Sequence, residues 1–96
     1  MIETIKDILN FCNCAIYFDY KNIGTVIQLN TLRKCIFDNF NETVPEIKLI
    51  KSQSIIDDMI LKINENEIEN IVDKIYDLRE NIIYMIGYKK MKEDSY

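Results

Sequence analysis

Cysteine is the side chain in this sequence best suited to metal binding or nucleophilic chemistry, and the chain has three: Cys12, Cys14 and Cys35. Structural zinc usually takes four cysteine or histidine ligands, and the sequence contains no histidine. On a helix, the Cys12-x-Cys14 spacing places the two thiols about 200° apart. Because Cys12 and Cys35 also fall on apolar stripes, we interpret them as core residues and expect no metal ion or other cofactor.

The groups that most enzymes use are missing from the sequence. Without histidine, the commonest general base is absent, together with the Ser/His and Cys/His nucleophile pairs. Two glycines are too few for a phosphate-binding loop or a dinucleotide fingerprint. The adjacent carboxylates of Asp57 and Asp58 diverge on a helix, where a solvated face explains them. We therefore predict that the protein is not an enzyme.

An acidic stripe is the first candidate binding feature, formed by Glu69, Asp73, Asp77 and Glu80. On the last predicted helix these four carboxylates share an arc of about 80°, opposite a seam of isoleucines. Such a stripe suits a partner protein with a basic surface, including a groove that otherwise holds nucleic acid. A solvated helix face has the same pattern, so both interpretations stay open.

Aromatic residues are the second candidate feature, and four of them cluster near the N-terminus: Phe11, Tyr17, Phe18 and Tyr20. The excess continues near the C-terminus with Tyr76, Tyr84 and Tyr88. Aromatic side chains are frequent anchors of protein interfaces. In a small domain they are also common core residues, and the sequence favours neither role over the other.

Helical periodicity predicts the elements that must position these residues. Apolar side chains recur every three or four residues over residues 2–20, 26–40 and 56–63, and most regularly over residues 68–85. We expect helices over about residues 2–21, 25–39, 45–63 (possibly two pieces, because of Ser52–Ser54) and 66–90, with Asn66 as the cap of the last. The fold class is all-α, a compact bundle of four to five helices in one domain (residues 1–90), followed by a frayed tail (residues 91–96).

A β-hairpin over about residues 14–29 is the alternative, which would make the fold α+β. Residues 14–20 and 25–29 are rich in β-branched and aromatic side chains, with Gly24 between them. Asp19 bears on the choice because on a helix it would lie within the apolar arc. Either the helix ends near residues 16–18, or Asp19 pairs with a buried donor or faces a partner.

Overall charge and hydropathy limit the partners and the location. The 96 residues carry a net charge of −4, and the sequence is 48% hydrophobic. An acidic surface disfavours direct binding to nucleic acid and to anionic membranes. The N-terminus has no signal-peptide pattern and no apolar run approaches the length that spans a bilayer, so we expect a soluble, cytoplasmic protein.

These observations predict a small, non-catalytic, intracellular protein that binds the surface of a partner protein. The size and acidity suit an inhibitor, immunity or antagonist protein, and 19 isoleucines and 10 asparagines are typical of AT-rich genomes, among them those of phages and large viruses. The alternatives are a helical oligomer that binds a small molecule and a structural or assembly subunit of a larger complex. Surplus apolar surface also predicts a homodimer.

Overall fold

Four helices make up most of the chain in a computed structural model, which describes residues 2–17, 26–67, 69 and 71–94. They are α1 (Ile5–Tyr17), α2 (Val26–Phe40), α3 (Glu46–Asn64) and α4 (Val72–Glu93). The described residues contain no strand. The predicted all-α bundle is therefore confirmed, with four helices.

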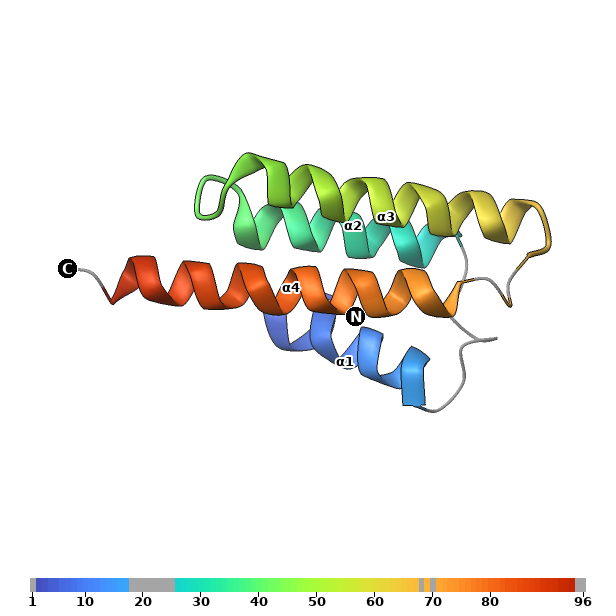
Figure 1. The fold of residues 1–96 in the computed structure, drawn as a ribbon, viewed down its shortest axis with the longest axis horizontal. Helices are drawn as coiled ribbons and strands as arrows, with labels where there is room; N and C mark the ends of the chain where they lie inside the picture. Colours follow the sequence, from blue (N-terminus) through green and yellow to red (C-terminus); the bar gives the residue numbers. More distant parts are fainter. Residues whose placement is uncertain (1, 18–25, 68, 70, 95–96) are drawn as a thin grey trace.

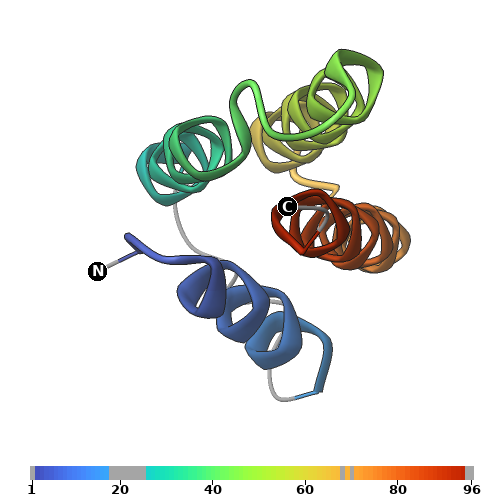
Figure 2. The same ribbon diagram turned by 90° about the vertical axis from the view of Figure 1, so that its left-hand side faces the viewer.

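The helices run alternately up and down, so that each one is antiparallel to the next (Figure 1). α1 packs against α2 and α4, and α3 packs against the same two helices, which closes the ring of a four-helix bundle (Figure 2). α1 is the shortest helix and lies along only part of α4. At the C-terminal end of α4, its last turns project beyond the turn that joins α2 to α3 (Figure 1).

The core lies on the axis of the bundle, where all four helices contribute apolar side chains. The predicted seam is buried wherever the structure describes it, at Ile71, the N-cap of α4, and at Ile75, Leu78, Ile82 and Met85. Ile68, the first residue of the seam, lies outside the described residues. The other helices face it with buried residues that include Ile8, Cys12, Leu29, Leu32, Ile36, Phe40, Ile56 and Met59. Two polar residues are buried among them, Ser52 of α3 and Asn81 of α4. None of the helices described is long and apolar enough to cross a membrane.

Local capping explains where two of the helices begin or end. At the start of α1, the Asp7 backbone N–H donates to Thr4 Oγ1 (3.2 Å) and the Thr4 N–H donates to Asp7 Oδ2 (3.0 Å), which is a capping box. α3 ends in a Schellman motif: Asn66 takes a left-handed φ of 58°, its N–H bonds to Ile63 O, and the Glu67 N–H bonds to Lys62 O. Asn66 therefore terminates α3 instead of capping α4, whose N-cap is Ile71.

The structure decides two alternatives that the sequence left open, and it makes the last helix longer than predicted. Residues 14–17 are in α1 and residues 26–29 are in α2, so the parts of the alternative hairpin that the structure describes are helical. The remainder of that segment, including Asp19 and Gly24, lies outside the described residues. α3 is continuous across Ser52–Ser54, because Ser52 is buried against α4. α4 extends to Glu93, three residues into the predicted tail.

Candidate functional site

The acidic stripe lies on the outer face of the bundle. Asp73, Asp77 and Glu80 are all exposed on α4, on the side opposite the buried seam. Glu69 is exposed as well, but it precedes the first residue of α4, Val72, so it is not part of the helix. Among the residues that the structure describes, no ion pair involves any of these four carboxylates.

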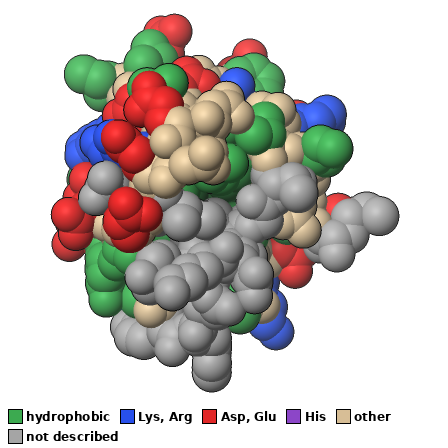
Figure 3. All heavy atoms as spheres, turned by 90° about the vertical axis from the view of Figure 1, so that its right-hand side faces the viewer, with side chains coloured by type: hydrophobic (Ala, Val, Ile, Leu, Met, Phe, Trp, Pro, Cys, Tyr) green, Lys and Arg blue, Asp and Glu red, His purple; other side chains and the backbone are tan. Residues whose placement is uncertain are grey.

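The stripe belongs to a larger acidic region. Residues 57–80 contain eight acidic and three basic residues, so this segment has a net charge of −5 against −4 for the whole chain. Two of the three basic residues form ion pairs within this region. Lys74 Nζ lies 3.3 Å from Asp58 Oδ2, and Lys62 Nζ lies 3.5 Å from Glu67 Oε2. Seen from the end where α4 begins, acidic side chains gather toward one side of the molecule (Figure 3). The bundle is thus electrostatically polarised.

Apolar side chains continue the same face of α4 toward its C-terminus. Ile83, Tyr84, Tyr88 and Met91 are all exposed there, and Tyr76 is exposed within the acidic half. The rings of Tyr84 and Tyr88 are stacked with centroids 6.5 Å apart, and Lys48 Nζ of α3 lies 4.4 Å from the centroid of Tyr84. Tyr84 thus contacts both Tyr88 and α3, and the two tyrosines are 49% and 39% exposed. The outer face of α4 therefore carries carboxylates in its first half, and exposed apolar side chains together with exposed lysines in its second half.

Phe11 is the only member of the predicted N-terminal aromatic group whose side chain the structure describes. Phe11 is half-buried and packs against the core, which agrees with the core interpretation of this residue. Phe18, Tyr20 and the side chain of Tyr17 lie outside the described residues, so their role as a binding surface stays a prediction. The exposed aromatic residues that the structure does show are Phe37 of α2 and Tyr76, Tyr84 and Tyr88 of α4. In the sequence, the four-residue spacing of Tyr84 and Tyr88 indicates that these two tyrosines lie side by side on a helix.

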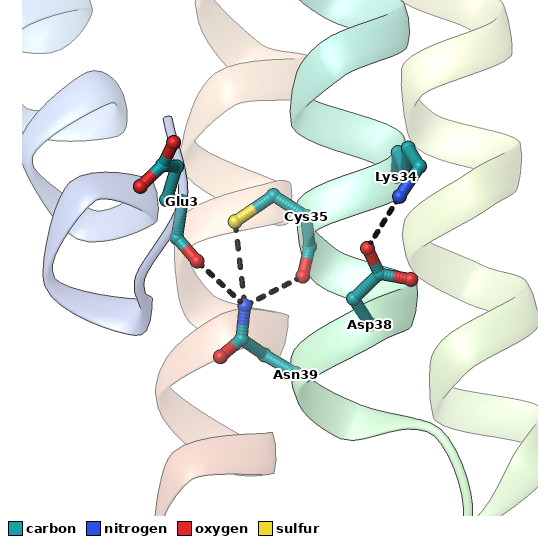
Figure 4. Close-up of polar contacts among 5 residues, drawn as sticks. All are labelled: Glu3, Lys34, Cys35, Asp38 and Asn39. Atoms are coloured by element: carbon teal, nitrogen blue, oxygen red, sulfur yellow. Dashed lines mark hydrogen bonds and ion pairs between the residues drawn. The ribbon is translucent and has the colours of Figure 1, made fainter. Parts of the chain in front are cut away.

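Cys35 lies beside a surface groove of about 370 Å³ between the N-terminal segment and α2. Asn39 Nδ2 is 3.4 Å from Cys35 Sγ and also donates to the carbonyl oxygens of Cys35 (2.8 Å) and Glu3 (3.2 Å). Figure 4 shows this contact, together with the ion pair of Lys34 and Asp38 (2.7 Å). These bonds attach the N-terminal segment to α2.

The electrostatics of this groove oppose nucleophilic chemistry. Burial raises the pKa of the Cys35 thiol; the hydrogen bond from Asn39 lowers it, but the nearby carboxylates of Asp7, Asp38 and Glu3 raise it further. Burial also raises the pKa of Cys12 to about 12, although the charge of Arg79 opposes the shift. Both thiols are therefore protonated at neutral pH, and the protonated form is a poor nucleophile and metal ligand.

The described residues contain no group of three or more histidine, cysteine, aspartate or glutamate side chains arranged to hold a metal ion. The outer face of α4, with its exposed carboxylates beside exposed apolar side chains, is the candidate site. Comparisons of this chain with models of protein families, with curated proteins and with solved structures found no match.

Proposed function

We propose that this protein is a small, non-catalytic, intracellular binding protein that acts by covering the surface of a partner protein. It belongs to the functional type of inhibitors, immunity proteins and antagonists, such as phages, viruses and mobile elements encode. The observation that carries this proposal is the exposed face of α4, where Asp73, Asp77 and Glu80 run into exposed apolar and aromatic side chains.

The composition of this face supports a protein partner with a basic surface. Asp73, Asp77 and Glu80 make no ion pair within the described chain. Their negative potential would attract a basic partner and increase the rate at which the two proteins associate. Exposed tyrosines supply contact area with little loss of conformational entropy, because each has only two side-chain torsions. Charge would steer the partner and the apolar half would retain it.

The proposed function is tested by reversing charge on the stripe. The full-length tagged chain is used to capture proteins from a lysate of the cells that encode it, and the captured protein is then purified for calorimetry. The Asp73→Lys, Asp77→Lys variant changes the net charge from −4 to 0. We expect its affinity for the partner to fall about tenfold or more, because two desolvated or steering contacts become repulsive.

The matched control is Glu3→Lys, Glu46→Lys, which makes the same change in net charge away from the outer face of α4. Both side chains are exposed, and neither is in an ion pair among the residues described. This control should bind the partner like the unmodified chain. Equal affinity of the α4 variant and the control, with both folded by circular dichroism, would exclude the acidic stripe as the binding surface.

A further inference from the structure

A groove of about 310 Å³ lies between the end of α2 and the start of α3, beside the turn that joins them. Apolar side chains supply much of its lining. Phe37 of α2 is 41% exposed and Ile50 of α3 is 54% exposed, and Val44 and Leu49 line the groove as well. Exposed apolar side chains that converge on one concave surface are typical of binding sites, whereas isolated ones are normal on any protein.

The charged side chains that line this groove are both acidic. Glu42 and Glu46 are exposed, and neither forms an ion pair among the residues that the structure describes. Lys89 and Lys92 of α4 border Glu42 in an adjacent hollow, but neither is paired with it, and Lys89 Nζ donates to Asn39 O (2.9 Å) instead. The groove thus combines an apolar lining with two carboxylates that form no ion pair within the described chain.

The groove and the outer face of α4 point in different directions. Figure 2 looks onto the end of the bundle where the turn joins α2 to α3, and in this view α2 lies diagonally opposite α4. The lining of the groove comes from α2, α3 and the turn between them. A partner bound to the acidic stripe of α4 therefore leaves the groove open, and the groove selects its own ligand.

We propose that this groove binds a short basic and apolar segment of another polypeptide. An apolar side chain of the segment inserts between Phe37 and Ile50, and lysine or arginine side chains beside it pair with Glu42 and Glu46. The same two carboxylates repel an acidic segment. A segment without apolar side chains would leave the lining exposed to water and gain nothing from it.

The dimensions of the groove favour a peptide over a free small molecule. Its volume is at the lower limit of small-molecule sites, which span about 300–1,000 Å³ and enclose most of the ligand. Ile47, three residues before Ile50, is 72% exposed and extends the apolar surface beyond the groove. Asn41 and Gln53 also line the groove, and their side-chain amides can both donate hydrogen bonds to peptide groups and accept them. A segment that lies across this surface uses all of these side chains.

Titration of the nitrogen-15-labelled full chain with capped tetrapeptides, followed by amide chemical shifts, tests this site. The probes are Lys-Leu-Leu-Lys, Glu-Leu-Leu-Glu and Lys-Ser-Ser-Lys, each added to about 1 mM, which detects dissociation constants down to and into the millimolar range. We expect Lys-Leu-Leu-Lys to shift amides within residues 37–53. It should bind about threefold or more tightly than the other two peptides, because it alone matches both the charge and the apolar lining.

The charged contacts are tested by the variant Glu42→Asn, Glu46→Gln. It should raise the dissociation constant of Lys-Leu-Leu-Lys about threefold or more, because two exposed ion pairs are lost. Asparagine suits the left-handed φ of 65° at Glu42, so the change does not strain the turn. The matched control, Asp73→Asn, Asp77→Asn, removes two carboxylates from the acidic stripe instead and makes the same change in net charge, from −4 to −2. It should bind the probe like the unmodified chain.

The apolar contact is tested by Ile50→Ser, which should also weaken binding of Lys-Leu-Leu-Lys about threefold or more. Ile27→Ser is the control, because Ile27 is 76% exposed on α2 and does not line the groove. The proposal is overturned by an absence of shifts at 1 mM, by shifts confined to the first half of α4, by equally tight binding of Lys-Ser-Ser-Lys, or by equal binding of the two serine variants when both are folded. None of these results would contradict the proposed function, whose own test is charge reversal at Asp73 and Asp77.

Discussion

Among single residues, Asn81 has the clearest energetic role. It is 3% exposed, and its Nδ2 donates to Ser52 Oγ (2.7 Å) and to Lys48 O (2.8 Å), which links α4 to α3. Asn81→Ala should lower the free energy of unfolding by about 1–3 kcal/mol, because Ser52 loses its buried partner and a cavity forms. Urea denaturation measures this change.

The double variant Ser52→Ala, Asn81→Leu separates the two causes. It removes both polar partners and restores apolar volume, so we expect it to be more stable than Asn81→Ala. Equal losses in the single and the double variant would contradict the unpaired Ser52 and the cavity as causes, whereas a double variant as stable as the unmodified chain would mean that the hydrogen bond itself makes no net contribution.

Sequence reasoning at this scale succeeded for the apolar seam and missed Asn81. Ile71, Ile75, Leu78, Ile82 and Met85 are all buried, because a repeat of three and four residues can be identified without knowing the partner helices. Asn81 lies beside that seam, and its burial depends on Ser52, which is 29 residues away in the chain. No local pattern contains that information. The exposure of Asp73, Asp77 and Glu80 was predictable, since it follows from the position of the seam.

Among the elements, α1 begins with a side-chain cap, which the described residues at the starts of α3 and α4 lack. Backbone hydrogen bonds from Glu3 and Thr4, and a further bond with the Thr4 hydroxyl, hold the pKa of Asp7 below its ordinary value. The folded pKa is lower than the unfolded one, so this stabilisation is complete above about pH 4 and is lost as the pH falls through the folded pKa. Thermal unfolding followed by circular dichroism between pH 6 and pH 2 should show a smaller acid-induced loss for Asp7→Asn than for the unmodified chain. An identical pH profile would contradict this role.

Helix boundaries were less predictable than helix positions. Ile2 fits the apolar stripe of the first helix and does pack against the core, yet α1 begins only at Ile5. A residue that precedes a helix can therefore fit the helical spacing of apolar residues, because its side chain packs against the same core. Asparagine is common both at the N-cap of a helix and in the left-handed conformation that follows a helix, so the type of Asn66 does not decide between them. The backbone hydrogen bonds that do decide, such as Asn66 N–H to Ile63 O, are seen only in the structure.

For the whole molecule, the uneven charge predicts a response to salt. The net charge of −5 in residues 57–80 opposes folding by self-repulsion, and dissolved ions screen that repulsion. Raising NaCl from 10 to 300 mM should increase the free energy of unfolding by a few tenths to about 1 kcal/mol, a size typical of exposed charge interactions. Asp73→Lys, Asp77→Lys should show a weaker response. A loss of stability with salt would instead mean that the Arg33–Asp57 and Lys74–Asp58 ion pairs dominate.

The three thiols differ in exposure, so their reaction with a dye can show whether part of the bundle opens. Cys14 is exposed, so a thiol-reactive dye should label the native chain at one position, whereas Cys12 and Cys35 react only after their surroundings open. Cys12 lies on α1 and Cys35 on α2, the helix pair at the N-terminal end of the chain. Detachment of α1 would expose both thiols, because the Cys35 thiol contacts the Thr4 carbonyl oxygen just before α1. Labelling of both faster than global unfolding would therefore show that α1 detaches while the other three helices stay folded, and labelling at the rate of global unfolding would show one cooperative event.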